Sequence, residues 1–211
     1  MKQPNIIYED NHLLVADKPA GLLTQPAPDQ LESLEMRAKQ WLKEKHQKPG
    51  NVFLHAVHRL DKPVSGLVLF AKTSKALERL NASVRAKEFQ KTYIALAEGE
   101  LAGNATLVHY LLHSEHHAQV VAKNHPQAKE ARLSCKLLEL RQHCSLIEID
   151  LETGRYHQIR LQLSHIGHPI VGDAKYGSRT LFQGIALHHT RLQITHPVTK
   201  EHLSFDSPPP F

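Results

Sequence analysis

The stretch HRLDKPVSGLVLFAK, residues 58–72, decides the fold prediction because a charged turn runs directly into a long apolar segment. The six residues GLVLFA at 66–71 are typical of a strand that is covered on both faces. Pro63 fixes its own φ and biases Lys62 towards an extended conformation, and Ser65 and Gly66 complete a tight turn. The stretch therefore predicts a rigid turn that carries Asp61 at the edge of a buried strand.

Asp61 has two interpretations at this stage. A carboxylate on a rigid turn is pre-positioned for attack on an electrophilic carbon. Arg59 lies two residues earlier, on the same side of an extended chain, and its guanidinium would either keep the carboxylate ionised or reach a ligand. A surface aspartate in a turn explains the same residues, so the pattern alone leaves both interpretations open.

The composition is that of a globular protein. The chain has 211 residues, of which 41% are hydrophobic and 22% charged, and its formal net charge of +5 slightly favours a polyanionic partner. Cys135 and Cys144 fit no metal or redox spacing. No segment approaches the roughly 20 apolar residues of a membrane helix, and the first residues lack a signal-peptide core. We expect a soluble, cytoplasmic monomer with no membrane partner.

The hydrophobic periodicity predicts more strands than helices, with no regular βαβ alternation. We therefore predict an α+β fold, an antiparallel-dominated mixed β-sheet flanked by a few helices, in one domain over residues 1–211. Ser74 is the expected N-cap of the second helix, and Gly167 is the expected C-terminal stop of the third. Residues 105–123 are rich in histidine and give no clear pattern. The expected helices span 31–46, 75–89 and 157–167, with Leu31 on the apolar face of the first and Leu80 on that of the second. The expected strands lie within 5–10, 12–19, 52–57, 66–73, 91–99, 130–155 and 186–205, and 130–155 is expected to be a hairpin that turns near Arg141–His143.

Several cofactor motifs do not occur in the chain. It contains no phosphate-binding glycine loop, no HExxH and no paired CxxC, so we expect no nucleotide cofactor and no metal. The segment HSEHH places His113 and His117 four residues apart, a spacing that can hold a metal on a helix, but a solvated histidine-rich surface explains it better. Ser65 lacks the glycine two residues earlier that a nucleophile elbow requires, which disfavours a serine hydrolase.

The segment HRLDKPVSGLVLFAK resembles the active-site motif of the RluA-type pseudouridine synthases. Three further segments resemble motifs of that family in the same order: KPAGLLT (18–24), KTYIALAEG (91–99) and TGRYHQIRLQLSHIGHPIVGDAKYG (153–177). The resemblance runs from about Ile6 to the C-terminal prolines. It implies the pseudouridine synthase fold, with an active-site cleft across the sheet and no S4-type RNA-binding domain. Val64 departs from the threonine that the family commonly has.

The resemblance also implies an activity and a set of site residues. The activity is isomerisation of specific uridines to pseudouridine in ribosomal or transfer RNA, with Asp61 either as nucleophile at the sugar or as the base that removes a 2′ proton. Tyr93 would stack on the target base, Arg155 would pair with the catalytic aspartate, and Arg59 would fill the space that a flipped base leaves. The weaker candidates are Lys18, Lys62, His157 and Arg160 for phosphate contacts and Val171 for the pocket wall.

Two other functions remain as alternatives. A non-catalytic RNA-binding module on the same fold would bind RNA without changing it. A glycosidase or nucleoside hydrolase would release a free base or sugar, but it needs a second carboxylate to activate water, and none of the motifs clearly supplies one.

Overall fold

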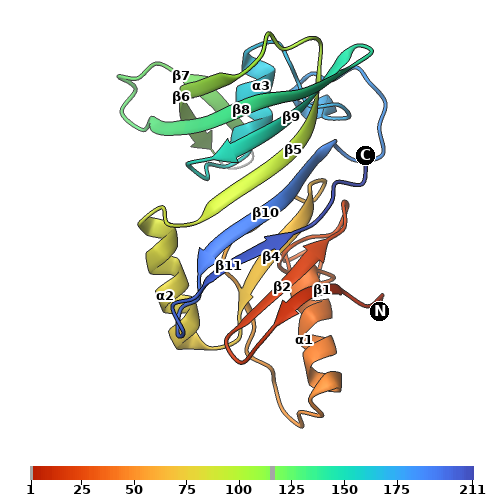
Figure 1. Ribbon diagram of the computed structural model, residues 1–211, viewed down its shortest axis with the longest axis vertical. Helices are drawn as coiled ribbons and strands as arrows, with labels where there is room; N and C mark the ends of the chain where they lie inside the picture. The colour runs from red at the N-terminus through yellow and green to blue at the C-terminus, as the bar shows by residue number, and fades with distance from the viewer. Residues whose placement is uncertain (1, 115–116) are drawn as a thin grey trace. The chain divides into compact units, whose positions relative to one another are not determined.

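The computed structural model describes residues 2–114 and 117–211, and within them the chain divides into two compact units (Figure 1). Unit 1 comprises Met1–Phe89 and His189–Pro209. Unit 2 comprises Gln90–His188 and Pro210–Phe211. The prediction of one domain over residues 1–211 stays a prediction.

The sheet of unit 1 has the strand order β1-β2-β4-β10, with β3 paired to β4 and β11 paired to β10. Its strands are β1 (Asn5–Glu9), β2 (Leu13–Lys18), β3 (His55–Ala56), β4 (Ser65–Ala71), β10 (Leu187–Thr195, which is part of unit 1 from His189 on) and β11 (His202–Asp206). All seven residues of β4 are buried, as the apolar run predicts. The antiparallel pairing of β2 with β4 sets Lys18 opposite Gly66, so the end of β2 lies beside the turn that carries Asp61.

Two helices belong to unit 1, α1 (Leu34–Lys45) and α2 (Ser74–Arg85). Helix α1 begins three residues later than predicted because the Ser33 side chain accepts a hydrogen bond from the Met36 amide and ends the extended segment there. Leu31, which was predicted on the apolar face, is 71% exposed. The predicted cap Ser74 is instead the first helical residue, and Thr73 is the N-cap, with its hydroxyl bonded to the Ala76 amide.

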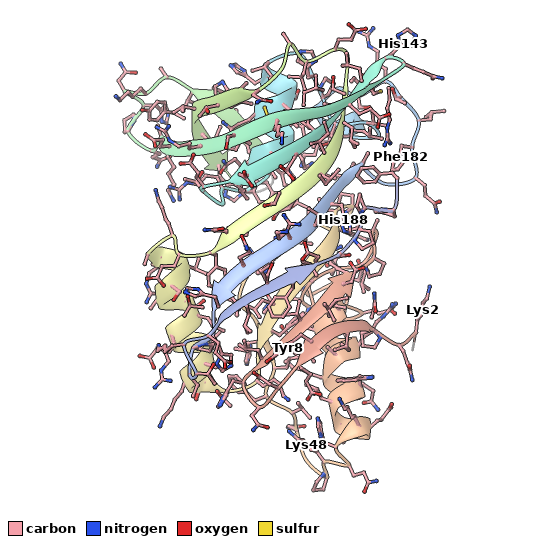
Figure 2. All side chains as sticks on the ribbon, in the orientation of Figure 1. Lys2, Tyr8, Lys48, His143, Phe182 and His188 are labelled. Atoms are coloured by element: carbon pink, nitrogen blue, oxygen red, sulfur yellow. The ribbon has the colours of Figure 1, made fainter. Side chains whose placement is uncertain are left out.

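Unit 1 has its own apolar core between the sheet and α2. The buried residues that form it include Leu13, Leu67, Leu80 and Leu192, each at most 1% exposed. Tyr8 packs against this cluster, with its ring centroid 5.1 Å from that of Phe205 (Figure 2). Leu80 comes from the face of α2 that the periodicity predicts to be apolar, so this part of the pattern identifies the core correctly.

The sheet of unit 2 has the strand order β5-β9-β8-β6-β7. Its strands are β5 (Gln90–Glu98), β6 (Ala105–Ser114), β7 (His117–Val121), β8 (Lys129–Arg141) and β9 (Cys144–Leu151). The β8–β9 hairpin turns at Gln142, whose φ is 46°, and at His143, as predicted (Figure 2). Both β6 and β7 lie within the unassigned histidine-rich segment, and the sequence pattern did not predict them.

Helix α3 (Gln158–His165) packs against β6 and β7 of unit 2 (Figure 1). Gly167 lies just beyond its last residue, has a φ of 87° and donates its amide to the Ser164 carbonyl at 3.0 Å. The His168 amide bonds to the Leu163 carbonyl at 3.0 Å, so the expected glycine stop is confirmed. A short 3-10 helix, η1 (Ala174–Tyr176), follows.

The observed elements confirm the predicted α+β class. Each strand pair whose register is described within the two units is antiparallel, and three α-helices accompany the strands in the described part of the chain. None of the helices in residues 2–114 and 117–211 has the length and apolar character needed to cross a membrane.

Candidate active site

The turn that carries Asp61 is closed by the main chain of unit 1. The Asp61 carbonyl accepts a hydrogen bond from the Val64 amide at 3.0 Å. The Val64 side chain is 3% exposed, so an apolar residue suits this position and the turn closes without a hydroxyl there. Gly66 follows with a φ of 114°, and a Cβ at this residue would lie 2.4 Å from the His189 carbonyl oxygen. Glycine is therefore required where β4 leaves the turn.

Lys18 fixes the same turn through hydrogen bonds to main-chain carbonyls. Its ammonium donates hydrogen bonds to the carbonyls of Leu22 at 2.7 Å, Pro19 at 3.1 Å and Lys62 at 3.2 Å. The Gly21 amide also donates to the Lys62 carbonyl, at 2.8 Å. The side chain of Lys18 is fully buried. Residues 18–22 are thus bonded to the residue that directly follows Asp61, and we call this arrangement the lysine clamp.

Thr24 fixes the residue before Asp61. Its hydroxyl donates to the Leu60 carbonyl at 3.0 Å and accepts from the Leu60 amide at 3.1 Å. Both Thr24 and Leu60 are buried. The 18–24 segment therefore holds the main chain on both sides of Asp61, which restricts where the carboxylate can lie.

The charge of Lys18 acts on the candidate carboxylate. Burial lowers the pKa of Lys18 to about 7, although the negative charges of Asp61 and Asp17 oppose this shift. The other cation considered for Asp61 within this loop, Arg59, is exposed, and its role stays a prediction. The predicted phosphate contact of Lys18 is wrong for this structure, because its ammonium is buried and donates to three carbonyl oxygens.

Two other predicted substrate contacts of unit 1 lie on its surface. Arg59 is exposed, and Lys62 is exposed with its ammonium 2.9 Å from the Gln30 side-chain oxygen. Both cations are accessible to a phosphate, and their contacts with RNA stay predictions.

Tyr93 lies on β5 of unit 2 and is 6% exposed. It is paired in register with Ile149 of β9, and its neighbour Thr92 bonds to the Asp150 carboxylate at 2.9 Å on the opposite face of the strand. Because Tyr93 and its neighbours on β5 are buried, the strand holds the tyrosine in a defined orientation. Its stacking on a base stays a prediction.

Arg155 lies in a turn that the Gln158 side chain holds. The Gln158 carbonyl oxygen accepts from the Thr153 hydroxyl at 2.7 Å and from the Arg155 amide at 3.0 Å. The Gln158 amide nitrogen donates to the Arg132 carbonyl at 3.1 Å. We call this the glutamine clamp. The Arg155 side chain is exposed and donates to the Glu130 carbonyl at 3.0 Å. Sequence reasoning missed Gln158, which only its place in the third motif could have suggested.

The predicted phosphate contacts of Arg160 and His157 are corrected by their surroundings. Arg160 is 5% exposed and forms a bidentate salt bridge with the Asp173 carboxylate at 2.7 and 2.9 Å. His157 lies 2.8 Å from the Tyr176 hydroxyl through Nδ1 and 3.1 Å from Arg160 through Nε2. These side chains connect the start of α3 to η1, so their polar atoms serve the fold of unit 2.

Val171 lies where the main chain of unit 2 is closely bonded. Its amide donates to the Leu96 carbonyl at 2.9 Å, and its carbonyl accepts from the Ala186 amide at 2.9 Å. The side chain is 4% exposed. Its place in the wall of a base pocket stays a prediction.

The histidine-rich segment gives no metal site in the part of the chain that the structure describes. Within that part, no group of three or more histidine, cysteine, aspartate or glutamate side chains could hold a metal ion. Glu115 and His116 of the HSEHH segment lie outside the described residues.

Comparisons with known proteins give the same family as the motifs. The family model described as RNA pseudouridylate synthase matches residues 12–165. The chain is 34% identical to the uncharacterized RNA pseudouridine synthase YhcT of Bacillus subtilis, over 98% of this chain and 68% of that protein. It is 34% identical to ribosomal large subunit pseudouridine synthase C of Vibrio vulnificus, over 98% of this chain and 66% of that protein. The chain thus spans about two thirds of the length of these relatives.

Solved structures show the same fold. Human RNA pseudouridylate synthase domain containing 4 has a TM-score of 0.82 at 20% identity, covering 98% of this chain and 88% of that chain. Human RNA pseudouridylate synthase domain containing 1 has a TM-score of 0.78 at 22% identity, covering 100% of this chain and 85% of that chain. The matched sequence motifs and this fold lead to one conclusion: the chain belongs to the RluA-type RNA pseudouridine synthases, a family of isomerases that convert uridine to pseudouridine in RNA.

Proposed function

We propose that this chain isomerises specific uridines of ribosomal or transfer RNA, with Asp61 as its catalytic carboxylate. The observation that carries the proposal is the turn of Asp61, which the lysine clamp and Thr24 hold on both sides. A carboxylate held in this way loses little conformational freedom when it meets its substrate, and this lowers the barrier to reaction.

The chemistry of the isomerisation requires such a group. The bond between C1′ of the ribose and N1 of the base breaks, the base turns, and C1′ bonds to C5. The C5 proton is lost and N1 ends with a proton, so the RNA keeps its atoms. Cleavage builds positive charge on the sugar, which Asp61 either traps as a nucleophile or relieves by removing a 2′ proton. The site must exclude water, because hydrolysis would release the base.

We propose further roles for three residues from the family resemblance. Tyr93 stacks on the base, and Arg155 supplies a planar guanidinium, a group that is well suited to bind a carboxylate. Arg59, an exposed cation two residues before Asp61, braces the RNA from which the nucleotide has left the stack.

Large-subunit ribosomal RNA is the first substrate to test. Relatives at 34% identity carry the names ribosomal large subunit pseudouridine synthase C and D, in Vibrio vulnificus and Pseudomonas aeruginosa. Transfer RNA is the second substrate to test. We propose that the protein acts in the cytoplasm as a monomer.

The test is release of tritium from large-subunit ribosomal RNA labelled at uridine C5. We expect the wild-type chain to release tritium and Asp61→Asn to release none above background while it still binds the RNA. Asparagine keeps the shape of the side chain and removes its charge. The matched control is Asp29→Asn, a change at an exposed aspartate of the same unit, which should retain wild-type activity. An Asp61→Asn chain with wild-type activity would refute the role of Asp61.

The same assay separates the alternatives. A non-catalytic RNA-binding module would retain the RNA without releasing tritium, on both ribosomal and transfer RNA. A glycosidase would release uracil, which chromatography of the products detects, and isomerisation leaves the RNA mass unchanged.

A further inference from the structure

Lys91 of unit 2 is a cation to which neither the described contacts of the fold nor the proposed mechanism assigns a role. It is the second residue of β5, two residues before Tyr93. Thr92 bonds to Asp150 on one face of the strand, so Lys91 and Tyr93 share the other face. The Lys91 side chain therefore lies on the surface that carries the predicted base-stacking residue.

The ammonium of Lys91 also lies beside the turn that carries Arg155. A Cβ placed on Gly154 would lie 3.5 Å from the Lys91 nitrogen. Gly154 directly precedes Arg155, and the glutamine clamp fixes this turn. Lys91 thus lies near the main chain next to Arg155 and on the same strand face as Tyr93.

The surroundings of Lys91 do not compensate its charge. Within the part of the chain that the structure describes, Lys91 forms no hydrogen bond or ion pair and faces no partner ring. Burial lowers its pKa from the ordinary value, and no carboxylate opposes this shift. Placing an ammonium where it is poorly solvated and unpaired is unfavourable for folding. Cations with such surroundings are concentrated at sites where a ligand supplies the opposite charge.

Lys18 shows how the same chain treats a lysine that serves its fold. Lys18 is buried and donates to three carbonyl oxygens. Lys91 is only partly exposed yet has no acceptor in the described residues. The described residues therefore leave the Lys91 ammonium available to an acceptor other than themselves.

We propose that Lys91 is a further substrate-binding residue, which donates to a phosphate oxygen of the RNA next to the target nucleotide. This inference rests on the proposed function, because phosphates are the anions that RNA offers. A phosphate oxygen would satisfy the ammonium and restore the solvation that the charge loses at this site. Lys91 and Tyr93 then contact one nucleotide through its phosphate and its base, beside the turn that carries Arg155.

The test compares Lys91→Met and Lys91→Arg with the wild type on large-subunit ribosomal RNA labelled at uridine C5. Binding is measured by filter retention over a range of KCl concentrations. Losing one phosphate contact lowers the slope of log K against log[salt] by about 0.7–0.9. We expect Lys91→Met to show this change and about tenfold weaker binding, and Lys91→Arg to restore both. The matched control is Lys136→Met, which removes an exposed lysine of β8 and should leave the slope within error of wild type.

Thermal unfolding of the free protein separates a ligand role from a structural role. Methionine removes an unpaired charge and keeps the apolar length of the side chain, so we expect Lys91→Met to melt at or above the wild-type temperature. A lower melting temperature together with weaker binding would mean that Lys91 serves the fold, and it would overturn the inference. An unchanged salt slope in Lys91→Met would also overturn it.

The activity assay keeps the two proposals distinguishable. If the wild type releases tritium and Lys91→Met keeps both its salt slope and its rate, Lys91 is not a phosphate ligand and the proposed function stands. If the wild type binds RNA without releasing tritium and Lys91→Met loses one unit of slope, the proposed activity fails and Lys91 remains an RNA ligand.

Discussion

The Asp61 turn of unit 1 and the Arg155 turn of unit 2 are held in similar ways, one by a charged side chain and the other by a neutral one. In each turn, one polar side chain bonds to the main chain next to the candidate functional residue, and one threonine hydroxyl adds to it. The clamp of the Asp61 turn is a buried ammonium. The clamp of the Arg155 turn is a neutral amide.

The difference follows the charge of the side chain that each turn presents. Lys18 and Asp61 interact through their charges, because the negative charge of Asp61 opposes the lowering of the Lys18 pKa by burial. At the Arg155 turn, the Gln158 amide makes the same number of hydrogen bonds as Lys18 makes at the Asp61 turn, but it adds no charge of its own. The comparison teaches that Lys18 has an electrostatic role in addition to its structural role, and that Gln158 has a structural role alone.

Replacing Lys18 with methionine should have the largest effect of the changes to the two clamps. Three carbonyl oxygens lose a donor, and Asp61 loses a nearby cation. We expect the free energy of unfolding to fall by about 2–4 kcal/mol. We expect kcat to fall at least about tenfold, which corresponds to about 1.4 kcal/mol in the barrier. Urea unfolding and tritium release under saturating RNA measure the two effects.

The control for this change is Lys62→Met, which removes an exposed lysine of the same loop. Its free energy of unfolding should stay within about 0.5 kcal/mol of the wild type. If Lys18→Met were as stable and as active as the wild type, the lysine clamp would have neither role.

Replacing Gln158 with leucine should have the next largest effect, and it should act on the fold more than on the charge of the site. The Thr153 hydroxyl loses a partner in a buried place, and the Arg155 amide and the Arg132 carbonyl lose one in partly buried places. We expect the free energy of unfolding to fall by about 2–3 kcal/mol. Gln193→Leu, at an exposed position of β10, is the matched control and should stay near the wild type.

A Gln158→Leu chain should keep its folded core and still bind RNA. Its kcat should be reduced, because the Arg155 turn is less well fixed. Rates at a range of RNA concentrations show whether kcat or KM changes. A loss of stability without any change in kcat would show that the position of this turn does not limit the reaction.

The local parts of this arrangement were predictable from the sequence, and the parts that depend on other segments were not. Three predictions that depend only on neighbouring residues are confirmed: the buried strand β4, the β8–β9 hairpin and the Gly167 stop. The burial of Lys18 and Arg160 depends on distant acceptors, Lys62 and Asp173, so both were mistaken for surface cations. The sequence of β6 and β7 alternates too weakly for a strand prediction. These strands form through pairing with other strands, β6 with both β7 and β8.

The smallest predicted effect concerns pH, and it tests the electrical difference between the clamps directly. Burial lowers the pKa of Lys18 to about 7 in the folded chain, against about 10.4 in an unfolded chain. Below pH 7 both states carry the proton, and the cost of burying the charge is present in full. Between pH 7 and about 10 the unfolded chain binds more protons, so stability rises with pH.

Between pH 7 and 8, we expect the wild type to gain about 1 kcal/mol of unfolding free energy relative to Lys18→Met. Gln158 does not titrate, so Gln158→Leu should keep the pH slope of the wild type at a lower overall stability. Urea unfolding of the three chains at pH 6.5, 7, 7.5 and 8 measures the slopes. If Lys18→Met had the wild-type slope, the two clamps would be electrically equivalent, and the proposed link between the charge of a clamp and the charge of the residue it presents would be wrong.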